Sequence, residues 1–135
     1  MLDVGQGLAA AIRTSTHVLI YDTGPKFSDT FDSGDAVIAP YLRYLGVGSV
    51  DRLVLSHADS DHIGGLTSLL RQVPVQQVMS SVAIESAPHA LPCSTPATWQ
   101  WDGVDFSVLY PPPADSGLRR KNDNDVSCVL RVSTA

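Results

Sequence analysis

Short apolar segments, separated by turn-forming residues, run through most of the chain. Residues 8–13 and 17–21 are two such segments with a three-residue polar turn between them, which predicts a pair of neighbouring strands. Further apolar segments of strand length occupy residues 51–56, 75–79, 104–110 and 126–132. Because strands of this length need another layer to cover their apolar faces, the pattern predicts a sheet-rich, layered domain.

Two helices are predicted between these strands. The first is indicated by apolar residues at helical spacing: Ile38, Tyr41, Leu42 and Leu45. Pro40 fits the first turn of that helix better than its interior, and Gly46 ends it. Residues 62–71 carry a second helical pattern, whereas the polar residues 25–34 and the proline-containing residues 86–98 predict loops.

Helices placed between strands indicate the α/β class, with residues 1–135 forming one domain. The last apolar strand reaches almost to residue 135 without a turn or a polar tail after it. We therefore expect the sheet to continue past this point and the domain to be incomplete at its C-terminus.

Composition and charge restrict the classes of function. Of the 135 residues, 44% are hydrophobic and 17% are charged, as in an ordinary folded domain. The chain contains no run of 18 apolar residues, which excludes a membrane-spanning helix within it. The formal net charge of −5 argues against an extended basic surface for nucleic acid. It is compatible with a nucleic-acid enzyme whose acidic residues hold metal ions.

The cysteines and tryptophans are predicted to be packing residues. Cys93 and Cys128 could form at most one bridge, and neither belongs to a CxxC motif. Their expected role is therefore that of small buried side chains. Trp99 and Trp101 alternate on one face of the chain, where packing against the core is favoured over stacking on bases.

The segment that carries chemistry is SHADSDHIGG at residues 56–65. Four potential metal ligands lie within six residues of one another: His57, Asp59, Asp61 and His62. Imidazole and carboxylate donors together suit zinc, manganese or iron better than calcium or magnesium. Four such ligands could hold two ions, an arrangement that activates water for in-line displacement at a phosphoester. The alternative is a solvated loop with Asp61 as a helix N-cap, which leaves both histidines unexplained.

Four motifs resemble one known family. The pattern from His57 to His62, followed by Gly64 and Gly65, resembles the HxHxDH signature of the metallo-β-lactamase superfamily, with Asp59 in place of its second histidine. Together with MLDVGQG at residues 1–7, YDTGP at residues 21–25 and NDVSCVL at residues 124–130, it most resembles the ComEC family of DNA-internalisation competence proteins. The resemblance implies an αββα sandwich, of which this chain supplies the N-terminal half and part of the second sheet.

The resemblance also implies a site and its metals. His57 and Asp59 would bind the first of two divalent ions, manganese or zinc, and Asp61 and His62 the second. Asp61 would also orient or deprotonate the attacking water as the catalytic residue. Asp22 matches the aspartate of the first motif, which supports the metal site; the alternative role for Asp22 is that of a turn residue before Thr23.

The implied activity is that of a metal-dependent nuclease that degrades DNA during natural competence. One strand is degraded while the other enters through a membrane channel formed by another domain of the same parent protein. Single-stranded DNA is therefore the expected nucleic-acid partner. The domain would lie on the extracytoplasmic face of the cell membrane, either periplasmic or at the cell surface.

The chain departs from the superfamily pattern in two places. Asn124 and Ser127 stand where many members have a third-motif histidine, and they suit hydrogen bonds to a substrate phosphate better than metal binding. The later aspartate and histidine motifs are expected beyond Ala135. The 135 residues alone are therefore expected to be inactive or weakly active, and to self-associate through an uncovered sheet. Two alternatives stay open: a hydrolase of small esters or phosphoesters, and a non-catalytic domain that binds DNA or a partner.

Overall fold

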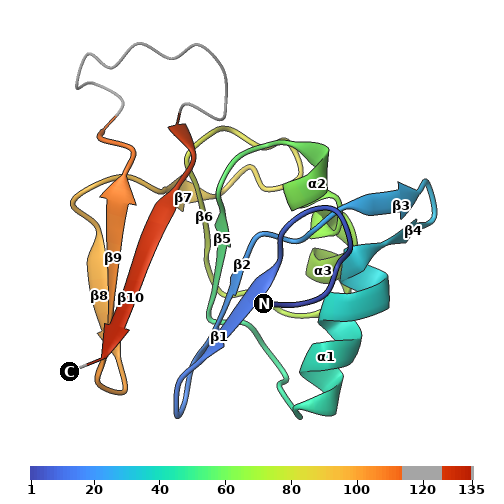
Figure 1. The fold of residues 1–135 in the computed structure, drawn as a ribbon, viewed down its shortest axis with the longest axis horizontal. Coiled ribbons are helices and arrows are strands. Elements are labelled where there is room, and N and C mark those ends of the chain that lie inside the picture. The colour runs from blue at the N-terminus through green and yellow to red at the C-terminus, as the bar shows by residue number, and fades with distance from the viewer. Residues whose placement is uncertain (114–125, 135) are drawn as a thin grey trace.

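The computed structural model describes residues 1–113 and 126–134. Figure 1 shows the elements of this structure. In chain order they are β1 (Ala10–Arg13), β2 (Val18–Tyr21), β3 (Lys26–Ser28), β4 (Phe31–Asp32), the π-helix η1 (Gly34–Ile38), α1 (Ala39–Tyr44), β5 (Arg52–Leu55), α2 (Ser60–Ile63), α3 (Leu66–Gln72), β6 (Val78–Ser80), β7 (Leu91–Pro92), β8 (Thr98–Trp101), β9 (Val104–Tyr110) and β10 (Val129–Thr134).

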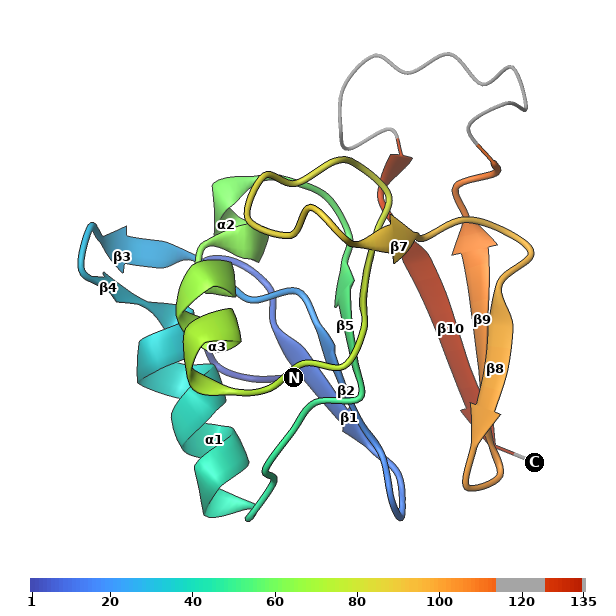
Figure 2. The same ribbon diagram turned by 180° about the vertical axis from the view of Figure 1, so that it is seen from behind.

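Two sheets and a layer of helices make up the fold. The larger sheet has the strand order β1-β2-β5-β6-β7, with β1 antiparallel to β2 and the other neighbours parallel. The smaller sheet is antiparallel, in the order β10-β9-β8. Helices cover one face of the larger sheet and the smaller sheet lies on the opposite side (Figures 1 and 2). The predicted α/β class is therefore confirmed, with the layers in the order helix, sheet, sheet.

Alternating residues of the central strands supply two separate cores. Leu53 and Leu55 of β5 belong to the core between the larger sheet and the helices, whereas Val54 between them belongs to the core between the sheets. β2 divides in the same way, with Ile20 in the first core and Leu19 in the second. This period of two explains why consecutive residues of these short strands are apolar: both faces of the strands are covered.

The predicted loop at residues 25–34 was wrong. These residues form the antiparallel hairpin β3–β4 and enter η1, which leads directly into α1. The hairpin escapes a pattern search because its strands bury only Asp32 and its sequence is polar. Pro40 lies in the first turn of α1, as predicted, and Gly46 follows that helix with a φ of 70°.

The predicted helix at residues 62–71 is two helices, α2 and α3, separated by Gly64 and Gly65. A Cβ at Gly64 would collide with the backbone of Pro25 and Lys26, and one at Gly65 with the backbone of Gly34. The two glycines therefore allow the chain to change direction while it packs tightly against the β3–β4 region. Within the described residues, no helix is long and apolar enough to span a membrane.

The smaller sheet contains one strand that the sequence pattern missed. Residues 104–110 form β9 as predicted. The missed strand of the smaller sheet is β8, which begins at the end of the predicted loop at residues 86–98. The same predicted loop also contains β7, which belongs to the larger sheet. Trp99 of β8 stacks on Phe106 of β9, with ring centroids 5.2 Å apart, so its predicted packing role is confirmed. The final strand begins at Val129 rather than at residue 126, and the N–H of Cys128 donates to the carbonyl oxygen of Ser56 outside the smaller sheet.

Cys93 and Cys128 form a disulfide, the one bridge that two cysteines allow. Both lie in the core between the sheets, where they do pack as buried side chains. The bridge connects the residue after β7 with the residue before β10, so it ties the edge of the larger sheet to the smaller one. Two cysteines 35 residues apart give no pairing signal in sequence, because the pairing depends on how the sheets stack.

Removing the bridge is expected to destabilise the fold. For a closed loop of this length, loss of the cross-link lowers the free energy of unfolding by about 2–4 kcal/mol. We expect the Cys93→Ala/Cys128→Ala double variant to show this loss in urea unfolding of the protein followed by circular dichroism. Dithiothreitol should destabilise the unmodified protein and leave the double variant unchanged; equal stability of the oxidised protein and the double variant would contradict the expectation.

Candidate metal centre

The four clustered ligands lie at one edge of the larger sheet, where β5 ends and α2 begins. His57 follows β5 by two residues, Asp59 is the residue before α2, and Asp61 and His62 belong to its first turn. β2 lies beside β5 in parallel, so its own carboxyl end reaches the same edge and brings Asp22 to His62. The strand order thus unites residues that are 40 positions apart in sequence.

The two imidazole rings lie against each other. The ring centroids of His57 and His62 are 3.9 Å apart, at an interplanar angle of 49°. Their side chains are 9% and 17% exposed, whereas those of Asp59 and Asp61 are 51% and 46% exposed. The rings therefore form the floor of the cluster and the carboxylates its solvent-facing rim.

The cluster consists of two His–Asp pairs. In one, His57 Nδ1 lies 3.5 Å from Asp59 Oδ2; in the other, His62 Nε2 lies 3.6 Å from Asp61 Oδ2. Within residues 1–113 and 126–134, no three His, Cys, Asp or Glu side chains are arranged to hold one ion together. Imidazole and carboxylate are donor types that zinc and manganese accept.

Asp22 is held by protein donors on both of its carboxylate oxygens. The backbone N–H of Ser56 donates to Oδ1 at 2.7 Å, and the Ser56 hydroxyl donates to Oδ2 at 2.5 Å. His62 Nδ1 lies 2.7 Å from the same Oδ2, so the proton of a neutral ring sits on Nδ1 and leaves the lone pair of Nε2 on the side of Asp61. Asp22 is fully buried, and burial raises its pKa, while the hydrogen bonds from Ser56 and His62 act in the opposite direction.

Asp22 contacts the His62 ring and also lies at a bend of the backbone after β2. Its φ of 59° makes it a turn residue, a left-handed conformation that aspartate adopts more readily than most side chains. Thr23 continues the turn by donating from its backbone N–H and its hydroxyl to the carbonyl oxygen of His62. The segment after β2 therefore holds both the ring and the backbone of His62.

The N-terminal motif packs against the other side of α2. The N–H of Leu8 donates to the carbonyl oxygen of Asp61 at 3.2 Å. A Cβ at Gly7 would collide with that same oxygen, so glycine is required for the approach. The motif MLDVGQG thus places backbone next to the metal-ligand segment.

The predicted phosphate-binding residues are only partly described. Asn124 lies outside the described residues. Ser127 is half-buried, and the neighbouring Cys128 donates its N–H to the carbonyl oxygen of Ser56 at 2.8 Å. The hydroxyl of Tyr21 donates to the carbonyl oxygen of Cys128 at 2.5 Å. These bonds bring the Ser127 segment beside the residue that precedes His57.

Ser56 supports the cluster and was not among the site residues predicted from the sequence. It is buried, it donates twice to Asp22, and its carbonyl oxygen accepts from Cys128 and from the hydroxyl of Ser81. The only signal in the sequence is its position directly before His57, at the end of a buried strand.

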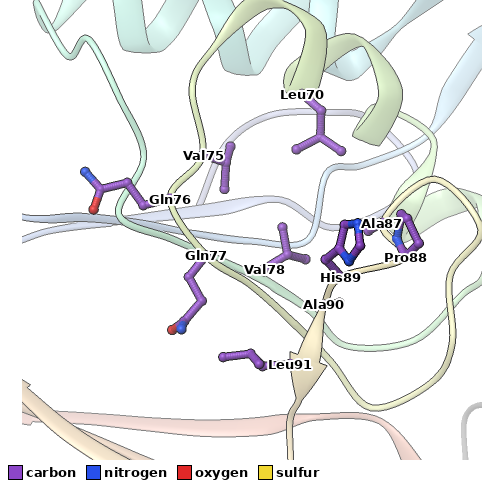
Figure 3. A pocket seen from close by; sticks show the side chains of 10 residues that line it. All are labelled: Leu70, Val75, Gln76, Gln77, Val78, Ala87, Pro88, His89, Ala90 and Leu91. Atoms are coloured by element: carbon purple, nitrogen blue, oxygen red, sulfur yellow. The ribbon is translucent and has the colours of Figure 1, made fainter.

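A separate pocket lies away from this centre, between α3 and the edge formed by β6 and β7 (Figure 3). It encloses about 410 Å³ and is lined mainly by apolar residues and amides, with His89 as its titratable side chain.

Comparison with known proteins places these features in a family. Residues 2–129 match the family model described as the metallo-beta-lactamase superfamily. The chain is 40% identical over 132 residues to Competence protein ComA of Neisseria gonorrhoeae, a match that covers 96% of this chain and 17% of that protein. It is 33% identical over 132 residues to Recombination protein 2 of Haemophilus influenzae, covering 97% of this chain and 16% of that protein. The chain thus spans about a sixth of the length of these relatives.

A solved structure shows the same fold. A HARLDQ-motif mutant of a metallo-beta-lactamase from Cronobacter sakazakii superposes with a TM-score of 0.69 at 15% identity, covering 98% of this chain and 56% of that one. The helix–sheet–sheet layers described above account for this match. The chain therefore belongs to the metallo-β-lactamase superfamily and, within it, to the ComEC-type domains.

Proposed function

We propose that the chain is the metal-binding part of a nuclease that hydrolyses phosphodiester bonds of DNA during uptake. The observation that carries this proposal is the His57–His62 ring pair with one carboxylate beside each ring. Members of the superfamily are typically metal-dependent hydrolases, and divalent metals such as zinc are their usual ions. The relatives named as competence and recombination proteins support a role in DNA uptake.

The residues divide the work between metal binding and positioning. His57 and Asp59 would hold one divalent ion and Asp61 and His62 the other, and Asp22 would orient His62 rather than bind metal directly. When bound, the two ions would polarise the phosphate and lower the pKa of a water molecule. Asp61, which is half-exposed, can accept a proton from that water, and Ser127 and Asn124 can donate hydrogen bonds to phosphate oxygens.

Charge explains why metal and DNA binding would be coupled. The chain carries a net charge of −5, and the rim of the cluster is formed by two carboxylates. Bound divalent cations reverse the local potential, so phosphates can approach a surface that would otherwise repel them.

The disulfide supports an extracytoplasmic location. Disulfides persist in oxidising compartments and are rare in the cytosol of most cells, and Cys93–Cys128 joins the two sheets of this domain. We place the domain outside the membrane, where it would receive single-stranded DNA next to a channel formed by another domain of the parent protein.

Self-association through the edge strand β10 is part of the same proposal.

Metal binding and cleavage provide the direct test. We expect the His57→Ala and Asp61→Asn variants to bind at least tenfold less manganese or zinc in calorimetric titration, while His89→Ala, an exposed histidine elsewhere, binds as the unmodified protein does. DNA cleavage should be negligible for residues 1–135 and should appear with metal when the residues that follow Ala135 in the gene are restored. Full metal binding by both cluster variants would contradict the proposed centre, and equal cleavage by the two chain lengths would contradict the proposed missing ligands.

Asp22 provides a test of positioning. Asp22→Asn keeps the shape of the side chain but removes the charge that fixes the His62 tautomer. Loss of such an outer partner typically lowers metal affinity 10- to 100-fold, and we expect that range here. The ¹⁵N chemical shifts of His62 should show loss of the Nδ1–H tautomer, with the circular dichroism spectrum unchanged. A normal metal affinity together with an unchanged tautomer would show that Asp22 is only a turn residue.

A further inference from the structure

Two exposed phenylalanine rings stand beside the candidate metal centre. Phe27 of β3 and Phe31 of β4 are 50% and 51% exposed, with ring centroids 5.7 Å apart. Among the described residues, neither ring belongs to either hydrophobic core. The two rings contact each other, and about half of each residue's surface faces water, where a base can stack.

The hairpin that carries these rings is attached to the metal-ligand helix. Gly64, directly after α2, donates its N–H to the carbonyl oxygen of Gly24 at 2.8 Å, and its backbone lies against Pro25 and Lys26. Ser33 closes the hairpin from the other side with a hydrogen bond to the carbonyl oxygen of Pro25. Figures 1 and 2 show β3 and β4 projecting next to α2 from either view. The rings therefore have a defined position relative to Asp61 and His62.

A hollow lies between Phe27 and the candidate metal centre. It encloses about 430 Å³, and its walls include Phe27 and Lys26 on one side and Ser60 and Asp61 on the other. Lys26 is half-exposed, and its only described ion pair is a 3.9 Å contact with the fully exposed Asp29, which contributes little. An aromatic face, a cation and a carboxylate of the metal cluster thus line the same space.

We propose that the β3–β4 hairpin is a stacking platform for a base of single-stranded DNA, with Phe27 as its main contact and Lys26 on the adjacent phosphate. Aromatic rings beside a cation suit single strands because every base has a π-face, so binding tolerates any sequence. The inference rests on the proposed function, since a phosphate at Asp61 would place a neighbouring base within the hollow that Phe27 lines. The competing occupant of this hollow is another segment of a longer chain that packs on the hairpin.

The test compares DNA with and without bases. Fluorescence anisotropy would measure binding of the metal-loaded protein to a labelled oligothymidylate and to an abasic strand with the same phosphates. Loss of one stacked base corresponds to about 5- to 150-fold in affinity. We expect Phe27→Ala to weaken binding to oligothymidylate by about tenfold or more and to leave the abasic strand unaffected. Phe27→Trp should restore binding, and Lys26→Ala should weaken both strands equally.

The controls separate this inference from the proposed nuclease activity. Tyr44→Ala removes another exposed aromatic ring, 86% exposed at the end of α1, and should bind both strands normally. Calorimetry should show unchanged metal affinity for Phe27→Ala. If Phe27→Ala leaves the affinity for oligothymidylate unchanged while the C-terminally extended protein cleaves DNA, the stacking platform is wrong and the proposed nuclease activity stands. Base-dependent binding through Phe27, together with no metal-dependent cleavage by the C-terminally extended protein, would support the platform and overturn the nuclease. No preference for oligothymidylate over the abasic strand in the unmodified protein would also overturn the platform.

Discussion

The buried carboxylate of Asp22 is the interaction on which the arrangement of the centre depends. A fully buried carboxylate is unfavourable unless hydrogen bonds replace its lost water. Three donors do so here: the N–H and hydroxyl of Ser56 and the ring of His62. Because these donors come from the end of β5 and from α2, satisfying one carboxylate joins three elements. The position of His62 is thus tied to the stability of the sheet edge.

Close backbone approach is the second requirement of the centre. Gly7 lies against the carbonyl oxygen of Asp61, and Gly64 and Gly65 lie against the segments that flank the β3–β4 hairpin. A side chain at any of these positions would move α2 away from its neighbours. The glycines of the quoted motifs therefore serve the geometry of the ligands without touching a ligand side chain.

The sequence allowed the layers to be predicted but not several of the contacts within them. β9 matches its predicted bounds, and β5 was found within two residues, because their apolar residues face covered layers. The β3–β4 hairpin was missed because its apolar residues face water, and the break between α2 and α3 because it depends on contacts with a distant segment. The cluster of candidate ligands could be predicted because its four members lie within six residues of one another. Its supports, Ser56 and the Cys93–Cys128 bridge, become visible only when strands far apart in sequence are neighbours.

The alternation of β5 between two cores has a consequence for errors in folding. Leu53 and Leu55 face the helices and Val54 faces the second sheet, so the register of the strand is specified from both sides. A slip of one residue would exchange the two sets and turn His57 to the opposite face. A chain with the wrong register would therefore lose packing in both cores at once. Proteases that degrade partly unfolded chains would then act on it, so a folded protein with His57 on the wrong face would not accumulate.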